Sequence, residues 1–470
     1  MKLIKLELYD DFRSLKSGFC VKFLNELDDA YDKNSFNSYC IVGRNGSGKS
    51  NILEVLSAIF YQLEIDYLDF LPKNRVENDE GEIEYEEIEF FLTQKRSPNS
   101  YKLEYYKKPS SLVLNSQHAG FNSEYKKVII IKEKDQKANI YIDDDFENVL
   151  SAVEAKVFLP DFIVGYSSGE NEILSLPFLK MKMVQYDEFA YYLSEDILYN
   201  SPESRMVYLD DTFSQAIFIT NFLFPDEKVH QIFKDTIGIK NIKEFRIVIN
   251  TDKTTTGLYD ENFPLFKGVA SRLDDLKSCA TLYHDNERKN QLVLDFYVDD
   301  SCREAFKKFF GQRLELFKFL QVLTILNYHH IDEDSRAKLY RSKSPYAKGF
   351  IPQASWDDRF FTFKHFRIEK EGVDELLLSR SLSDGEHQFM HTIGIALLYR
   401  GTSSLFLLDE PETHFNPAWR AKYISTLREC FEGNDVSPEV LITSHSPFIV
   451  SDSKTDNVLV FEKDVNGVVT

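Results

Sequence analysis

Residues 43–50 have the sequence Gly43-Arg44-Asn45-Gly46-Ser47-Gly48-Lys49-Ser50. This stretch fits the pattern G-x-x-x-x-G-K-[ST] at every position. An apolar run at 39–42 (YCIV) precedes it, and an amphipathic run at 51–60 (NILEVLSAIF) follows it. A strand, a glycine loop and a helix in this order are the context in which such a loop binds phosphates. The stretch therefore predicts a nucleotide-binding loop within an α/β fold.

Each residue type of this loop has a task in holding a nucleoside triphosphate. Glycines let successive backbone N–H groups turn inward around the phosphates, and the helix N-terminus adds its positive end. We expect Lys49 to reach the β- and γ-phosphates and Ser50 to bind Mg²⁺, with Asn51 completing the binding segment. The expected ligands are therefore ATP and Mg²⁺.

Residues 405–410 (LFLLDE) are four apolar residues that end in two carboxylates. They predict a buried strand with Asp409 and Glu410 at its C-terminal end. We expect Asp409 to hold Mg²⁺ and Glu410 to polarise the attacking water. A strand that ends in Asp-Glu is a weak signal alone. It becomes strong in a chain that also carries a phosphate-binding loop.

Residues 383–388 (SDGEHQ) lie about 26 residues before Asp409. Taken alone, Ser383 with Glu386 three residues later describes an ordinary helix N-cap with a capping box. That interpretation is compatible with a role in nucleotide binding, because a helix N-terminus attracts phosphate. The distance to Asp409 favours such a role.

His445 stands in residues 443–447 (TSHSP), about 35 residues beyond Glu410. The apolar run directly before it predicts a strand, so that the histidine lies at a strand end. A lone histidine is more often structural, but this position also suits a residue that senses the γ-phosphate. His414, with Asn416 beside it, is expected in a dimer-contact loop after the two carboxylates.

The order of these four segments resembles that of ABC/SMC-type ATPases. Ser50-Asn51 and the opening pattern L-x-L-x-x-x-FRS at 6–14 look more like SMC, RecF and OLD-type heads than like a transporter cassette. Further runs resemble restriction-system-associated AAA-family ATPases, such as the ATPase subunit of Septu-type anti-phage systems. These runs are 2–19, 43–61 and 166–178.

The resemblance implies one ATPase head assembled from both ends of the chain around an insertion. Its parts are residues 1–185 with the phosphate-binding loop, an inserted mixed α/β domain at 186–349, and residues 350–470 with the C-terminal motifs. The middle region sustains no heptad repeat, so we expect no long coiled coil.

The resemblance also implies a composite site between two copies of the chain. In such heads the helix start with Ser383, Gly385 and Glu386 faces the γ-phosphate bound by the other protomer. The expected catalytic residues within one protomer are Lys49, Glu410 and His445. Head-to-head homodimers are therefore expected, because Ser383 cannot reach the nucleotide held by its own phosphate-binding loop.

Three features of the sequence have more than one interpretation. Residues 166–172 (YSSGENE) look like a second signature segment, but they lie more than 200 residues before the carboxylates. They are either a capped helix start or an active-site or interface loop. The glutamine expected beside the nucleotide in such heads is Gln94 or Gln185. Arg13 either approaches the nucleotide or is a surface cation.

The chain has 470 residues, a formal net charge of −20 and a pI near 5.1. Such an acidic surface repels nucleic-acid phosphates on average, so contact with DNA requires a local basic patch. The candidate residues are Arg336, Lys338, Arg341, Lys343 and Lys348, with tyrosines between them. The same run is equally well interpreted as a solvated loop beside acidic residues.

Neither a signal peptide nor an apolar run near the roughly 18 residues that cross a bilayer is found in the sequence. The five cysteines are far apart and form no C-x-x-C pair, as expected for free thiols in a reducing compartment. We therefore expect a cytoplasmic protein with no membrane association.

The main functional hypothesis is an ATP-hydrolysing sensor or regulator in bacterial anti-phage defence. The 25 residues after His445 leave no room for the TOPRIM nuclease domain of OLD-type proteins, so we expect the nuclease to be a separate subunit. The resemblance to Septu-type systems implies that this subunit is of the HNH type. The alternatives are a RecF-like or SMC-like DNA-repair ATPase that loads or senses DNA, and a nucleotide switch that scarcely turns over.

Overall fold

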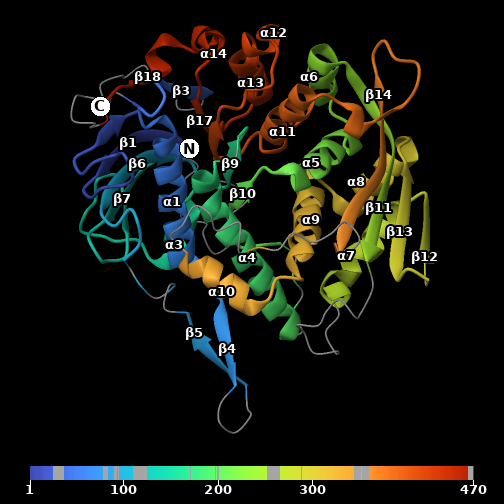
Figure 1. The fold of residues 1–470 in the computed structure, drawn as a ribbon, viewed down its shortest axis with the longest axis horizontal. Coiled ribbons are helices and arrows are strands. Elements are labelled where there is room, and N and C mark those ends of the chain that lie inside the picture. Colours follow the sequence, from blue (N-terminus) through green and yellow to red (C-terminus); the bar gives the residue numbers. More distant parts are fainter. Residues whose placement is uncertain are drawn as a thin grey trace.

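The computed structural model shows an α/β fold, which confirms the expected fold class (Figure 1). It describes residues 1–24, 36–77, 83–88, 91, 93, 95–109, 124–169, 171–195, 197, 199, 201–250, 265–286, 288–342, 351, 359–463 and 469. Within these ranges the strands form three larger sheets and a separate hairpin.

The central sheet is parallel and carries the sequence motifs. In the described part of the chain its strands follow the order β10 (Met206–Tyr208), β9 (Ile163–Ser167), β16 (Leu405–Asp409), β17 (Glu439–Thr443), β3 (Asn37–Gly43) and β18 (Val458–Phe461). Every neighbouring pair is parallel. The C-terminal ends of the strands therefore meet at one edge, where ligands bind in sheets of this kind.

The two faces of the central sheet belong to two hydrophobic cores. Along β16, Leu407 enters one core and the adjacent Leu408 enters the other. A strand that is buried on both faces needs apolar residues at every position, as residues 405–408 provide. Helix α1 (Lys49–Tyr67) packs on the first face and α11 (Asp384–Leu398) on the second.

The second sheet is antiparallel and shares its core with α1. Its strand order is β2 (Cys20–Lys22), β1 (Lys2–Leu8), β6 (Tyr101–Lys107), β7 (Lys126–Lys132) and β8 (Asn139–Ile142). A hairpin of β4 (Lys73–Glu77) and β5 (Ile83–Glu87) projects from the body of the molecule (Figure 1).

The third sheet joins the expected insertion to the C-terminal part of the chain. Its strand order is β12 (Leu282–Asn286), β13 (Gln291–Tyr297), β11 (Ile239–Asn250), β14 (Phe361–Lys370) and β15 (Leu377–Leu378). Strand β14 lies beyond the expected boundary at 349/350, and β10 of the central sheet lies inside the expected insertion. The sheets therefore do not divide the chain at the expected boundaries of 185/186 and 349/350.

The other helices of the described residues are α3 (Ala152–Phe158), α4 (Glu172–Ser194), α5 (Asp211–Leu223), α6 (Glu227–Ile237), α7 (Leu265–Cys279), α8 (Asp300–Phe310), α9 (Arg313–Ile325), α10 (Glu333–Arg341), α12 (Pro417–Arg420), α13 (Tyr423–Phe431) and α14 (Pro447–Asp452). Gly311 separates α8 from α9 because it adopts a left-handed conformation with φ 70°. The longest helix in these ranges, α4, has 23 residues, and no long coiled coil occurs in them. None of the described helices is both long and apolar enough to span a membrane.

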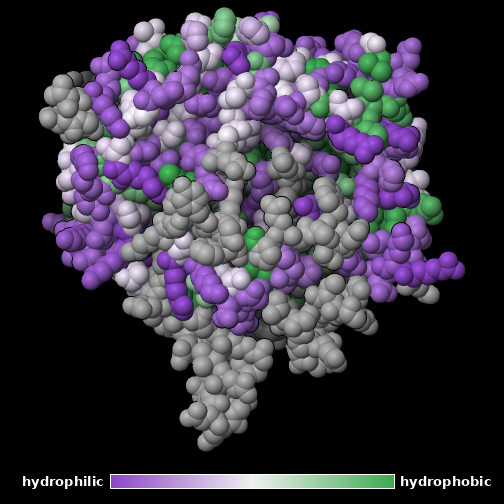
Figure 2. Space-filling view, viewed as in Figure 1, coloured by the Kyte–Doolittle hydropathy of each residue, from purple (hydrophilic) through white to green (hydrophobic). Residues whose placement is uncertain are grey.

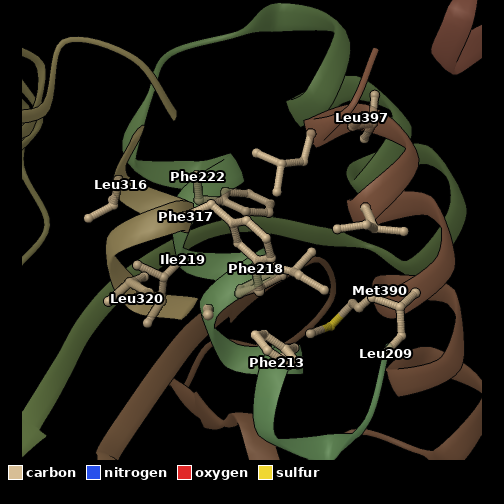
Figure 3. Packing of buried hydrophobic residues seen from close by; sticks show 14 of the residues in the cluster. Leu209, Phe213, Phe218, Ile219, Phe222, Leu316, Phe317, Leu320, Met390 and Leu397 are labelled. Carbon is tan, nitrogen blue, oxygen red and sulfur yellow. The ribbon is translucent and has the colours of Figure 1, made fainter. Parts of the chain in front are cut away.

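Large apolar side chains join the middle of the chain to the C-terminal part. Figure 3 shows Phe213 and Phe222 of α5, Phe317 of α9 and Met390 of α11 in one cluster. All four are fully buried, and each such side chain contributes about 1.5–3 kcal/mol to stability. The helix that begins after Ser383 is therefore anchored on the middle of the chain.

Arg336 requires a correction to the expected DNA-binding run. Hydrophilic residues dominate the surface seen in Figure 2. The Arg336 side chain is not part of that surface, because it is only 6% exposed. Its Nε lies 2.8 Å from Asp187 Oδ1, and its guanidinium lies over the ring of Tyr186. Arg336 therefore cannot contact a nucleic-acid backbone. Of the other cations, two are exposed on α10 and two lie outside the described residues, namely Lys338 with Arg341 and Lys343 with Lys348.

Arg336→Ala is expected to destabilise the fold by about 3 kcal/mol, because it leaves the buried carboxylate of Asp187 without its cation. Urea denaturation followed by circular dichroism measures the change. Lys338→Ala removes an exposed cation from the same helix and should change the stability by less than about 0.5 kcal/mol. Equal effects of the two variants would contradict the buried ion pair.

Candidate functional site

Glycines shape residues 43–50 into a tight cradle. Gly43, Gly46 and Gly48 have φ values of 154°, 75° and 95°, which side chains rarely permit. A Cβ atom on Gly43 would lie 2.2 Å from the backbone oxygen of Phe461. The glycines therefore allow a tight turn in which backbone N–H groups can face a bound phosphate, as a phosphate-binding loop requires.

Lys49 begins α1 and points back into this loop. Its Nζ donates to the backbone oxygens of Gly43 at 3.0 Å and Arg44 at 3.1 Å. Burial lowers the pKa of Lys49, whereas the nearby carboxylates of Glu410 and Asp409 act in the opposite direction. A desolvated ammonium group gains from further anionic partners, so this arrangement favours phosphate binding.

Ser50 lies beside Asp409, although 359 residues separate them in the sequence. The Ser50 hydroxyl donates to Asp409 Oδ1 at 3.0 Å. The hydroxyl of Thr443, at the end of β17, donates to the same oxygen. Hydroxyl and carboxylate oxygens are ligands that Mg²⁺ prefers, so the pair expected from the sequence fits this ion.

Asn171 belongs to this site, although the sequence did not single it out. Its Nδ2 donates to Asp409 Oδ2 at 2.8 Å and lies 3.4 Å from Glu54 Oε1. Its Oδ1 accepts from the backbone N–H of Leu174, so the same side chain caps α4. The described residues of this segment, 166–169 with 171 and 172, therefore include both a capped helix start and a loop of the site. Their place follows from β9, which pairs with β16 and ends beside it.

Glu54 on α1 extends this corner to Arg13. Its buried carboxylate lies 3.6 Å from Arg13 Nε. Burial raises the pKa of Glu54 to about 7, and Arg13 and Asn171 oppose that shift. Arg13 is only partly exposed and has a left-handed backbone with φ 56°. It is therefore held at the edge of the site by a buried carboxylate.

Glu410 and His445 face each other at the end of the sheet. Glu410 Oε1 lies 3.3 Å from His445 Nε2, and both side chains are 42% exposed. The backbone of Glu410 is left-handed, with φ 49°, and its N–H donates to the oxygen of Thr443 at 3.1 Å. A glutamate rarely adopts this conformation, so its neighbours hold it in place. A carboxylate that meets solvent beside a histidine can accept a proton from water.

A second carboxylate lies behind this pair. Glu412 is buried and accepts a hydrogen bond from the Ser444 hydroxyl. Burial raises the pKa of Glu412 to about 6. Because Ser444 lies between the end of β17 and His445, this contact fixes the backbone just before the histidine. The sequence signal for this role is an acidic residue two positions after Glu410.

The helix start at Ser383 is separate from the phosphate-binding loop. Ser383 Oγ accepts from the N–H of Glu386 at 3.4 Å, and Glu386 Oε2 accepts from the N–H of Ser383 at 2.8 Å. This is the expected capping box. Ser383 and Asp384 are exposed, and α11 packs on the face of the central sheet opposite α1. The helix start is therefore accessible to a second molecule.

The remaining candidates have other places. Gln185 is buried within α4, about 20 Å along the helix from Asn171 at 1.5 Å per residue, and Gln94 lies outside the described residues. His414 and Asn416 are exposed in the segment after β16. Asn171 rather than Gln185 therefore supplies the side-chain amide beside Asp409.

A family profile described as "AAA domain, putative AbiEii toxin, Type IV TA system" matches residues 271–451. This range contains the Ser383 helix start, both carboxylates and His445. No curated protein matches the chain. The family match and the phosphate-binding loop together support an ATPase of the P-loop type.

The solved structures to which this chain is similar include heads of SMC proteins. An SMC head bound to the C-winged helix domain of ScpA has a TM-score of 0.37 and 12% identity, over 100% of this chain and 96% of that chain. The SMC head domain from Thermotoga maritima has a TM-score of 0.35 and 12% identity, over 100% and 98%. An SMC head with an extended coiled coil, bound to the C-terminal domain of ScpA and derived from Pyrococcus furiosus, has a TM-score of 0.35 and 12% identity, over 100% and 95%.

Asn171→Ala is expected to weaken the binding of Mg²⁺ about tenfold, because it removes a donor that orients the Asp409 carboxylate. Isothermal titration of Mg²⁺ in the presence of a non-hydrolysable ATP analogue measures the change. The variant also loses a helix cap, which costs about 1 kcal/mol of stability.

The matched control is Asp332→Ala. Asp332 caps α10 by accepting from the N–H of Ser335 at 2.7 Å, and among the described residues no hydrogen bond or ion pair joins it to the site. This variant should lose similar stability and keep its affinity for Mg²⁺. An unchanged affinity in Asn171→Ala would remove Asn171 from the metal site.

Proposed function

We propose that this chain hydrolyses ATP with Mg²⁺ at a site shared between two copies of itself, and that it regulates a separate nuclease in bacterial anti-phage defence. The observation that carries the ATPase proposal is a convergence at one edge of the parallel sheet. There Ser50 meets Asp409, and a solvent-exposed Glu410 meets His445. A carboxylate beside a hydroxyl and a carboxylate beside a histidine, both at the C-terminal edge of a parallel sheet, are typical of active sites.

Each side chain then has one task. Lys49 binds the phosphates together with the backbone N–H groups of residues 43–48. Ser50 and Asp409 would hold Mg²⁺, which neutralises charge on the phosphate oxygens. Glu410 accepts the proton of the attacking water.

His445 orients the Glu410 carboxylate and senses the γ-phosphate. Both side chains are 42% exposed within one chain. A dry site strengthens electrostatic interactions and protects the reaction from bulk water. A second molecule that covers this pair would supply that protection.

Homodimerisation would bring such a second molecule. The exposed start of α11 carries the positive end of a helix and a serine hydroxyl, which together attract an anion. In a head-to-head dimer, Ser383, Gly385 and Glu386 of one copy face the γ-phosphate bound by the other. We propose this arrangement as the active form.

The proposed role in defence rests on two similarities. The runs quoted above resemble ATPases of restriction-associated and Septu-type systems, and the matching family profile names a toxin of a toxin–antitoxin system. Both kinds of system join a regulator to a harmful effector. We propose an HNH-type nuclease as the effector. The remaining candidates for contact with DNA are Lys338 and Arg341, with Lys343 and Lys348, which lie outside the described residues.

Glu410→Gln is expected to keep ATP binding and to lower turnover at least about 100-fold, because an amide cannot accept the proton. Phosphate release measures turnover, and sedimentation in ATP should show a trapped dimer. Glu429→Gln, on the exposed side of α13, is the control and should behave as the unmodified protein. Unchanged hydrolysis in Glu410→Gln would exclude this role, and normal ATP affinity in Lys49→Ala would exclude the phosphate-binding loop.

Affinity purification of the tagged chain from its native host is expected to recover a small nuclease. The experiment compares the unmodified chain with Lys49→Ala, so that nucleotide-dependent partners are distinguished from constant ones. Mass spectrometry identifies the partners. Recovery of replication or repair proteins without a nuclease would contradict the defence proposal and favour the DNA-repair alternative.

A further inference from the structure

Gln388 joins three segments of the chain with one side chain. It lies in the second turn of α11 and is 3% exposed. Its Oε1 accepts from the backbone N–H of His414 at 2.9 Å, and its Nε2 donates to the Tyr166 hydroxyl at 3.0 Å. A backbone N–H can only donate, so the oxygen of the amide must face His414 and its nitrogen must face Tyr166.

Both partners of Gln388 belong to segments that hold the catalytic carboxylates. From the Tyr166 segment, Asn171 donates to Asp409, and the N–H of Ser168 donates to the Asp409 backbone oxygen at 3.1 Å. In the His414 segment, the Thr413 hydroxyl donates to the backbone oxygen of Glu410 at 2.9 Å.

The two segments are also joined directly, since the hydroxyls of Ser168 and Thr413 lie 2.8 Å apart. Residues 166–169 and 171, together with residues 409–414, therefore form one hydrogen-bonded unit around the two carboxylates. We call this the carboxylate unit.

The start of α11 is seated on the carboxylate unit. A Cβ atom on Gly385 would lie 2.6 Å from the backbone oxygen of His414, so the helix touches that backbone closely. Five residues before Gln388, Ser383 is exposed at the helix N-terminus. A displacement of the carboxylate unit would therefore move this exposed helix start through Gln388 and the Gly385 contact.

We propose that Gln388 is a positioning residue that couples the two ATP sites of the dimer. Within one protomer, Gln388 links Asp409 and Glu410 to the exposed helix start at Ser383. In the proposed dimer this helix start contacts the ATP bound by the partner. The inference rests on the composite site proposed above. Its consequence is that occupation of one site changes the fit of the other, so that dimerisation and turnover depend cooperatively on ATP concentration.

The test compares Gln388→Met with the unmodified protein. Methionine has a similar shape and volume but makes neither hydrogen bond. We expect a Hill coefficient for ATP hydrolysis that falls towards 1, and ATP-dependent dimerisation that is weakened about tenfold. Binding of a fluorescent ATP analogue to the dilute, monomeric chain should stay the same. A folding defect would lower ATP binding by the monomer together with the Hill coefficient and dimerisation, whereas loss of coupling leaves ATP binding by the monomer unchanged.

Three further variants sharpen the test. Tyr166→Phe removes one of the two hydrogen bonds, keeps the ring and should produce part of the effect, and it carries the test alone should Gln388→Met fail to fold. Gln388→Glu keeps an acceptor for His414 and accepts from the Tyr166 hydroxyl, so it should restore the coupling. Gln321→Met, which alters a buried glutamine of α9 outside the carboxylate unit, should leave the Hill coefficient and dimerisation unchanged.

A folded Gln388→Met or Tyr166→Phe variant with the Hill coefficient and dimer affinity of the unmodified protein would overturn the inference. A different outcome identifies failure of the composite site itself. If the unmodified protein binds ATP but does not form a dimer in its presence, the proposal of a shared site is wrong, whatever the Gln388 variants show.

Discussion

The carboxylate of Asp409 is the group on which the rest of the site depends. It is buried, and a buried carboxylate is unfavourable unless donors surround it. Ser50 and Thr443 donate to one of its oxygens, and Asn171 donates to the other. Ser50 and Asn171 follow β3 and β9, and Thr443 is the last residue of β17, so the donors come from distant parts of the sequence. The parallel order β9, β16, β17 and β3 brings their ends to one edge, so the requirement to satisfy Asp409 and the order of the sheet support each other.

The central sheet explains why α1 and α11 both begin near its C-terminal edge and yet lie on opposite faces. Helix α1 leaves β3 there, and α11 leads into β16 through residues 399–404, so both helices begin at the edge where Asp409 lies. Their apolar sides enter different cores, on opposite faces of the sheet. One start holds the cradle of glycines and Lys49, whereas the other presents Ser383 to solvent. This separation is the geometric reason for proposing a dimer.

The sequence predicts the parts of the site whose chemistry is local. The glycine loop, Asp409, Glu410 and His445 each stand in a short motif beside an apolar run, and the strands expected there are present. Residues 166–172 were left open between a helix start and a site loop. The contact of Asn171 with Asp409 could not be predicted, because Asp409 lies 238 residues away and only the pairing of β9 with β16 brings them together. Arg336 was wrongly expected at the surface, because a basic run does not reveal the distant acid that buries one member. The pairing of β14 with β11 across the expected boundary at 349/350 is likewise invisible in any local motif, because it joins distant segments of the chain.

The backbone of Glu410 joins the proposed catalytic site to the proposed dimer surface. Its left-handed backbone is sparsely populated for a glutamate, and it persists because both of its peptide groups are bonded. The N–H is held by β17 through Thr443, and the carbonyl is held by Thr413 within the carboxylate unit. The N–H of Glu410 is therefore bonded to the strand that precedes His445, and its carbonyl is bonded to the unit on which the start of α11 is seated. A packed unit shifts between discrete arrangements rather than deforming smoothly, and this is the physical basis for the proposed coupling of Glu410 to the surface at Ser383.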